Sequence, residues 1–311
     1  MKKEKIIFMG TPPIAQTILR RLVEEEYDIV LAVTQPDRKS GRKQKITMSA
    51  VKEYALLQDI PLFQPQNIKS EYKEIMGIDA DLIVTCAYGQ FVPEELLEMP
   101  KYGAINLHAS LLPKLRGGAP VHKAIIEGDK ESGMSIMRMV KKMDAGAVMA
   151  QCRVKIAEDD TAGSLFEKLA AAGAALLIEQ LPSIFDGSAV FHEQDEAQAT
   201  FAYTITPQEE KIDLQRPLQE VYNQARGLIP FPAGYVLHQG KKVKLHKVRK
   251  KAGSHHCPIG EFVGLMDGGM AIAVQDGYLL VDEIQLEGKK RTDAKSFYNG
   301  VGKQWVRSCF E

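Results

Sequence analysis

Two residues in one short apolar run carry side chains suited to oxyanion and proton-transfer chemistry. Asn106 and His108 are separated by one residue within a strand-like pattern at 103–108. Because side chains alternate along a strand, both lie on the same face. An amide donates hydrogen bonds and an imidazole titrates near neutrality, so the pair predicts stabilisation of negative charge on an oxygen together with proton transfer. For His108 alone, a buried structural histidine is an equally good interpretation.

The chain after this run has the composition of a ligand-binding loop. Residues 110–113 read Ser-Leu-Leu-Pro, and Arg116 is followed by two glycines. Proline fixes the backbone at one point of the loop, and the glycines free it at another. Asp144, in an Asp-Ala-Gly turn, adds a carboxylate, although taken by itself an Asp at this position is better explained as a turn residue.

The elements that must position these residues alternate between strand and helix. Apolar runs at 5–10, 28–35, 61–63, 80–88 and 103–108 alternate with helical patterns after residue 13, at 49–58 and at 119–127. This order predicts βαβ units and a mostly parallel sheet, which binds ligands at the carboxyl ends of its strands. We expect a neighbouring strand pair at 133–140 and 148–156, then a long helix at 161–185.

The first strand-to-helix turn argues against two common ligands. It reads Gly10-Thr11-Pro12-Pro13, which matches neither the dinucleotide fingerprint nor a P-loop. NAD and ATP binding at this turn are therefore disfavoured. We interpret Gly10 as a residue that permits a tight turn.

The second part of the chain has a different pattern. Residues 188–199 are polar and lack periodicity, so we expect a linker there. One helical segment follows at 218–226. Five short β-type runs, at 234–237, 242–246, 262–265, 270–274 and 278–284, predict a small β-barrel.

Taken together, Asn106, His108, the 110–113 loop with Arg116-Gly117, and the 144–146 turn resemble the folate-dependent formyltransferase superfamily. The resemblance implies an α/β fold, with a Rossmann-like, mostly parallel sheet in a catalytic domain at 1–188. A linker at 189–205 and an OB-like β-barrel domain at 206–311 would follow. It also implies 10-formyltetrahydrofolate as co-substrate and no metal.

The resemblance assigns roles to the matching residues. Asn106 is expected to donate to the formyl oxygen, His108 to stabilise that oxygen and carry a proton, and Asp144 to orient His108 or a proton-carrying water. The folate is expected to bind at the loop Ser110, Leu111, Leu112 and Pro113. Ala147 and the basic Lys141-Lys142 depart from the common pattern around the turn.

Two basic segments resemble those of superfamily members that formylate methionyl-initiator tRNA. The first is an insertion at 36–45, in which Arg42, Lys43 and Lys45 are candidate tRNA contacts and Arg42 matches the key arginine. A solvated surface loop is the alternative interpretation. Because the insertion follows the second strand, we expect it to form a mobile loop over the active site.

The second basic segment lies in the expected barrel, after a run at 226–234 that resembles the start of that domain. Residues 241–251 contain seven Lys or Arg and no acid, and alternate basic with apolar residues. Such a strand presents a charged face to a phosphate backbone, or protects a barrel edge from aggregation. The candidate tRNA contacts here are Lys241, Lys242, Lys244 and Lys247.

Other functions stay open at this point. The acceptor amine could belong to an amino-sugar nucleotide or to glycinamide ribonucleotide, and a non-catalytic RNA-binding protein is an alternative of another class. We expect a cytoplasmic monomer without a membrane segment: no apolar stretch approaches 18 residues, and the four cysteines are scattered. His255-His256-Cys257 has no partner cluster spaced for a metal site. Trp305 is expected to pack in a core.

Overall fold

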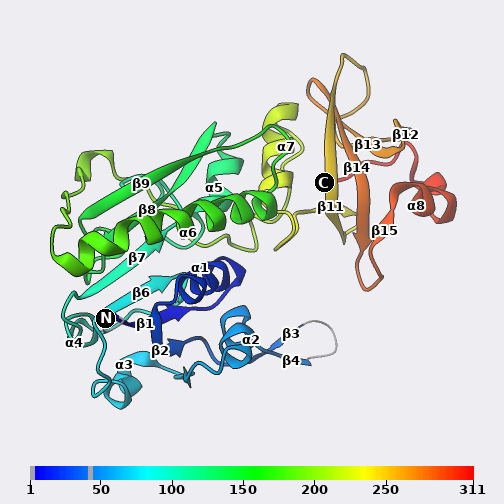
Figure 1. The fold of residues 1–311 in the computed structure, drawn as a ribbon. Coiled ribbons are helices and arrows are strands. Elements are labelled where there is room, and N and C mark those ends of the chain that lie inside the picture. Colours follow the sequence, from blue (N-terminus) through cyan, green and yellow to red (C-terminus); the bar gives the residue numbers. More distant parts are fainter. Residues whose placement is uncertain (1–3, 41–44) are drawn as a thin grey trace. The chain divides into compact units, whose positions relative to one another are not determined.

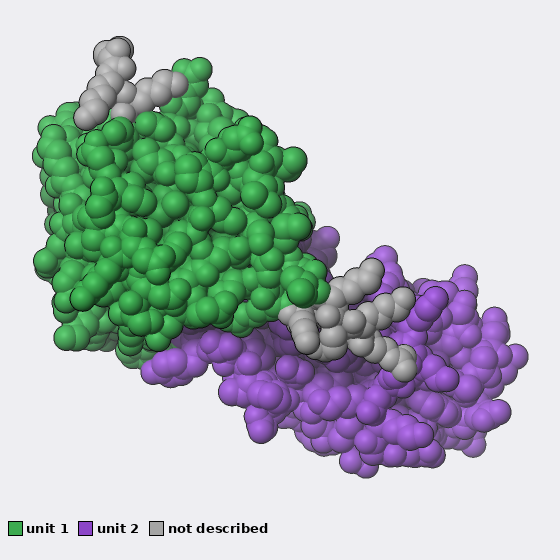
Figure 2. All heavy atoms as spheres, turned by 90° about the horizontal axis from the view of Figure 1, so that it is seen from below, with its two compact units in different colours: residues 1–117, 132–154, 166–201 green, residues 118–131, 155–165, 202–311 purple. Residues whose placement is uncertain are grey.

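The computed structural model describes residues 4–40 and 45–311, which form two compact units (Figure 2). The N-terminal unit holds residues up to 117 together with 132–154 and 166–201. The C-terminal unit holds 118–131, 155–165 and 202–311. The chain therefore enters the C-terminal unit twice before residue 202.

A seven-stranded sheet forms the centre of the N-terminal unit (Figure 1). Its order is β5-β2-β1-β6-β7-β8-β9, with bounds Leu62–Phe63, Asp28–Val33, Lys5–Gly10, Leu82–Cys86, Ala104–His108, Glu131–Arg138 and Val148–Lys155. The pairs from β5 to β7 are parallel, and β8 is antiparallel to β7. The predicted mostly parallel sheet is confirmed. β1 and β6 read as continuous apolar runs because nearly every residue in them is buried.

Helices connect these strands along the chain, and the predicted helices after residue 13, at 49–58 and at 119–127 are all present. The helices of the N-terminal half are α1 Pro13–Glu24, α2 Ala50–Leu57, α3 Ile68–Glu71, α4 Glu94–Leu97 and α5 Pro120–Ile126, with the short 3-10 helix η1 at Tyr72–Glu74. α1 buries one apolar face. A Cβ on Gly10 would lie 2.6 Å from Cβ of Ala15, so the first turn requires glycine for close strand-to-helix approach.

Helix α6, Ala162–Asp186, is long and apolar enough to cross a membrane by length and composition alone. Our expectation concerned an unbroken apolar stretch, and Glu167, Lys168 and Glu179 interrupt the apolar residues of α6. Packing explains the apolar composition: a Cβ on Gly173 would lie 2.9 Å from Met134 of β8, and Leu169, Leu177 and Leu181 are fully buried. α6 therefore buries one apolar face and exposes the other.

The C-terminal unit is built on an antiparallel sheet (Figure 1). Its order is β10-β11-β14-β13-β12, with β15 beside β14, and the bounds are Tyr235–His238, Lys241–Ala252, Gly277–Leu286, Gly269–Val274, Phe262–Met266 and Thr292–Asp293. The five predicted strands are all present. The accompanying helices are α7 Leu218–Gly227, α8 Ala294–Gly300 and the 3-10 helix η3 Gly302–Trp305.

The C-terminal segment of the chain joins the two ends of this sheet. The backbone of Glu311 exchanges hydrogen bonds with Leu237 of β10, at 2.8 and 2.9 Å. Phe262 of β12 donates to the carbonyl of Ser308 and accepts from the amide of Arg307, both at 2.9 Å. Residues 307–311 thus close the sheet into the predicted barrel, which leaves fewer unpaired edges.

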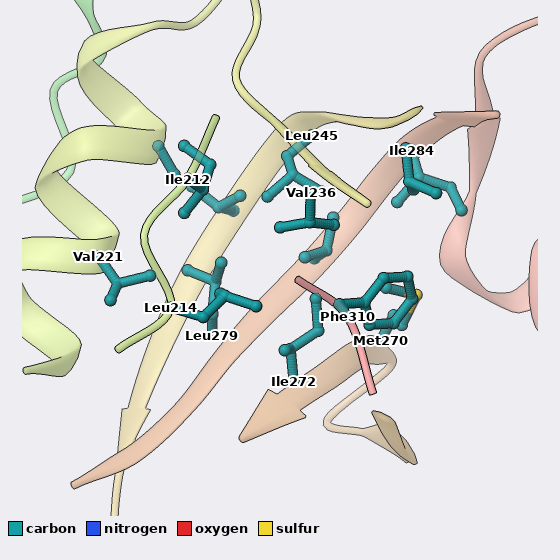
Figure 3. Close-up of a cluster of buried hydrophobic side chains, with 14 of the residues drawn as sticks. Ile212, Leu214, Val221, Val236, Leu245, Met270, Ile272, Leu279, Ile284 and Phe310 are labelled. Carbon is teal, nitrogen blue, oxygen red and sulfur yellow. The ribbon is translucent and has the colours of Figure 1, made fainter. Parts of the chain in front are cut away.

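The barrel encloses a single apolar cluster (Figure 3). Val236, Leu245, Leu279 and Ile284 of the strands and Val221 of α7 point into it. Trp305 packs against this cluster, and its ring stacks on His238 with centroids 3.8 Å apart. The prediction that Trp305 packs in a core is confirmed.

The basic insertion is partly described. Its arms form two paired antiparallel strands, β3 Arg38–Ser40 and β4 Lys45–Thr47, where the sequence predicted only a loop. Arg42 and Lys43 lie outside the described residues, and for Lys45 the structure describes the backbone alone.

Candidate active site

β7 carries Asn106 and His108 at the carboxyl end of the parallel part of the sheet. Alternation places both side chains on one face, while Ile105 and Leu107 face the opposite side and are buried. His108 is only 6% exposed, whereas Asn106 is half-buried.

Both ring nitrogens of His108 have defined neighbours. Nε2 lies 3.0 Å from the carbonyl oxygen of Leu115, which can only accept, so Nε2 carries a proton. In the neutral ring Nδ1 is then the proton acceptor, and it lies 3.7 Å from Oδ2 of Asp144. That separation is too long for a direct hydrogen bond, so Asp144 is a neighbour of Nδ1 without being bonded to it.

Asp144 is held in a turn by its backbone and its carboxylate. Its φ of 49° lies in the left-handed region, where Asp is among the more tolerated residues. The amide of Gly117 donates to Oδ2 at 2.8 Å. A Cβ on Gly146 would collide with the carbonyl of Arg138, so the Asp-Ala-Gly turn needs its glycine.

Asn106 is oriented by a residue that the sequence analysis missed. The hydroxyl of Thr85 in β6 lies 2.8 Å from Oδ1 of Asn106, and the two residues are register partners. With the hydroxyl proton on that oxygen, the Asn106 amino group is available to donate to a ligand. A lone polar residue near the end of the apolar β6 run was the signal for Thr85.

The 110–113 loop is anchored by side chains of β8 and β9. Ser135 donates to the carbonyl of Ser110 at 2.6 Å and accepts from the amide of Leu112 at 3.2 Å, and Gln151 donates to the carbonyl of Leu112 at 2.9 Å. Ser110 and Leu112 are buried, whereas Leu111 and Pro113 are partly exposed. Of the four predicted folate contacts, Leu111 and Pro113 are therefore the more accessible.

The loop that follows β6 and contains Tyr88 leaves the sheet at the point where the strand order reverses. β1 and β6 are adjacent there, and such a switch point is the usual ligand crevice of an open α/β sheet. The carbonyl of Tyr88 accepts from Thr11 at 3.0 Å and from Gln35 at 3.2 Å. Sheet topology was the signal that would have added these residues to the candidate site.

Arg116, the residue before Gly117, is a fully buried cation. Its guanidinium donates to Glu196 at 3.0 and 3.3 Å and to Gln194 at 2.8 and 3.1 Å. The hydrogen bonds from Arg116 and then Lys142 lower the pKa of Glu196 to about 2. Both acceptors lie in the segment predicted as a linker.

The predicted tRNA contacts of β11 are on the C-terminal unit. Val243, Leu245 and Val248 are buried, while Lys241, Lys242 and Lys247 are exposed. The ammonium groups of Lys242 and Lys244 have local partners, the Tyr235 ring at 4.0 Å and the Pro232 carbonyl at 2.8 Å.

The other basic residues of β11 form ion pairs. Arg249 pairs with Asp282 at 2.6 Å, Lys251 with Asp267 at 2.7 Å, and Lys250 with Glu158. Three of the seven basic residues of β11 are therefore paired with acidic side chains, so the strand carries less net positive charge than its sequence suggests. Among the described residues, no group of three His, Cys, Asp or Glu side chains could hold a metal ion.

Comparison with known proteins covers both units. A family model described as formyl transferase matches residues 4–181, and one described as formyl transferase, C-terminal domain, matches 204–302. The methionyl-tRNA formyltransferases of Bacillus licheniformis and Halalkalibacterium halodurans are 45% and 46% identical to this chain over 303 residues, covering 96% of each chain.

Two solved structures are similar in fold. A sugar 3N-formyl transferase aligns with a TM-score of 0.65 at 19% identity, over 93% of this chain and 100% of the other. HypX from Aquifex aeolicus in complex with tetrahydrofolic acid aligns with a TM-score of 0.71 at 16% identity, over 98% of this chain and 48% of the other.

Proposed function

Because the chain belongs to the formyltransferase family, we propose that it transfers the formyl group of 10-formyltetrahydrofolate to the α-amine of methionyl-initiator tRNA. The observation that carries the choice of acceptor is the identity of 45–46% over 96% of the chain to methionyl-tRNA formyltransferases. The products are tetrahydrofolate and N-formylmethionyl-tRNA, which serves translation initiation.

The reaction needs a nucleophile, a place for negative charge and a proton path. The amine nitrogen attacks the formyl carbon, the C–N10 bond breaks, the amine loses a proton and N10 gains one. An α-amine titrates near pH 8, so a useful fraction is neutral near pH 7. No metal and no covalent enzyme intermediate are required.

The three candidate catalytic residues fit these needs. The free amino group of Asn106 donates to the formyl oxygen as charge develops there. Nδ1 of His108 accepts and returns a proton, and Asp144 stabilises the charged ring. The folate is placed against the loop Ser110, Leu111, Leu112 and Pro113, which borders this face.

The tRNA is proposed to contact both basic segments. Arg42, Lys43 and Lys45 of the insertion would meet the acceptor end, and Lys241, Lys242, Lys244 and Lys247 of β11 the phosphate backbone. We retain the boundaries 1–188, 189–205 and 206–311 for the catalytic domain, linker and tRNA-binding domain. We place the protein in the cytoplasm, as a monomer.

One assay separates the possible acceptors. Purified protein is incubated with 10-formyltetrahydrofolate and with methionyl-initiator tRNA, a 3-amino-sugar nucleotide or glycinamide ribonucleotide. Formylation of the tRNA alone is expected. Transfer to either small acceptor in its place would contradict the proposal, and tRNA binding without transfer to any acceptor would favour the non-catalytic alternative.

A further inference from the structure

We propose that Gln194 is a positioning residue of the active site, which acts through Asp144 and Arg116, and that Thr200 plays the same role through Leu115. The inference rests on the proposed function and adds residues to its site. It concerns part of the segment that, by sequence, resembles a linker.

All four hydrogen-bonding positions of the Gln194 carboxamide are in use. Nε2 donates to the carbonyls of Asp144 at 2.9 Å and Gly146 at 2.7 Å. Oε1 accepts from Nε and Nη2 of Arg116, at 3.1 and 2.8 Å. An amide has two donors and two acceptor lone pairs, so the orientation of Gln194 is fixed by its partners.

These bonds join two loops that meet at one carboxylate. The Gln194 amide holds the backbone of Asp144, and Gly117, which follows Arg116, donates its amide to the Asp144 carboxylate at 2.8 Å. Arg116 is fully buried, and a buried cation must keep its partners. Gln194 therefore holds the backbone of Asp144 directly, and it holds the carboxylate indirectly, through Arg116 and the neighbouring Gly117.

Thr200 holds the other neighbour of His108. Its Oγ1 accepts from the amide of Leu115 at 2.9 Å, and its carbonyl accepts from the amide of Arg116 at 2.9 Å. The carbonyl of Leu115 is the acceptor for Nε2 of His108. Gln194 and Thr200 thus support the two groups that face the two ring nitrogens of His108.

The decisive variant removes the donors of Gln194 and keeps its acceptor. In Gln194→Glu the side chain still accepts from Arg116, but a carboxylate oxygen now faces the carbonyls of Asp144 and Gly146. Displacement of a catalytic group by about 1 Å costs on the order of 10²-fold in rate. We expect kcat to fall about 10- to 100-fold, with KM for folate and tRNA within about 2-fold, since the Gln194 carboxamide is fully bonded to protein groups.

Gln198→Glu is the matched control. It makes the same chemical change four residues away, where Nε2 of Gln198 donates only to Asp195 at the surface. Because Gln198 and Asp195 are both exposed, the new carboxylate can rotate into solvent away from Asp195, so kcat and the melting temperature should match those of the wild type. Thr200→Val is the second test variant, and because Thr200 is exposed it can be used even if Gln194→Glu does not fold. It should lower kcat in the same way.

A measurement without substrate keeps the two proposals separate. The ¹⁵N resonances of the His108 ring should differ from wild type in Gln194→Glu and Thr200→Val, and coincide in Gln198→Glu. If the wild type formylates tRNA and both test variants match Gln198→Glu in kcat and in the spectrum, the positioning role is wrong. If the wild type formylates nothing, the proposed function fails, and the His108 spectrum still decides the positioning role.

Discussion

Nδ1 of His108 lies 3.7 Å from Oδ2 of Asp144, and that same oxygen accepts a hydrogen bond from the backbone of Gly117. One carboxylate oxygen thus faces both the ring and the loop that follows β7. Because Nε2 is bonded to Leu115, only Nδ1 is available to accept a proton. A proton that His108 accepts in the proposed reaction would therefore bind at Nδ1.

Single replacement of Asn106, His108 or Asp144 by Ala should lower formyl transfer about 10²–10⁴-fold, because oxyanion or acid–base assistance is removed. Steady-state rates with methionyl-tRNA are the measurement, and circular dichroism checks folding. Asp144→Ala should also lower the melting temperature, because it leaves the Gly117 amide without its acceptor. Three folded variants with near wild-type rates would refute the assignment.

Thr85→Val should weaken catalysis without changing the shape of the β6 core. The valine keeps the volume of the buried Thr85 but removes the hydroxyl that orients Asn106. We expect kcat to fall by about 10-fold, the factor that corresponds to about 1.4 kcal/mol less transition-state stabilisation. Thr17→Val, which removes an exposed hydroxyl bonded to Pro13, is the control and should have wild-type kcat.

Arg42→Ala should impair transfer to tRNA and spare folate binding. The residue belongs to the insertion, whereas the proposed folate contacts follow β7. Parallel titrations with tetrahydrofolate and single-turnover transfer to methionyl-tRNA separate the two effects. Equal losses in both would contradict this division of roles.

Neutralising Lys241, Lys242, Lys244 and Lys247 to Gln should weaken tRNA binding and flatten its dependence on salt. For every phosphate that the protein no longer neutralises, the logarithmic salt slope becomes shallower by about 0.9 on a duplex. Lys251→Gln is the control, because Lys251 already pairs with Asp267. Unchanged affinity and slope in the quadruple variant would exclude β11 as a tRNA-binding surface, provided folate binding is intact.

Stability should fall at mildly acid pH because of His122. Burial, and then the nearby Lys123, lower the pKa of His122 from 6.5 to about 4. The unfolded chain therefore binds a proton that the folded chain does not between about pH 6.5 and 4, so stability falls as pH falls through that window.

His122→Gln tests this directly, since it retains a donor for the carbonyl of Phe231, 3.1 Å from Nε2, and cannot titrate. Melting temperatures of both proteins are measured from pH 7.5 to 4. The variant should lose less stability than the wild type as the pH falls. Parallel curves would mean that His122 does not contribute.

Local patterns in the sequence determined the elements and the face on which the candidate catalytic residues lie. Alternation at 103–108 is enough to place Asn106 beside His108, and Gly10 marks the first strand-to-helix turn. The apolar runs likewise predict a parallel sheet followed by a barrel, because periodicity reports which side of each element is buried.

The tertiary structure alone decided which groups support that site. The Gln194–Asp144 bond spans 50 residues and the Thr200–Leu115 bond spans 85. Closure of the barrel by residues 307–311 likewise joins strands far apart in the chain. Such contacts leave no periodic signal, because a polar side chain in an irregular segment looks the same whether it faces solvent or a distant backbone carbonyl.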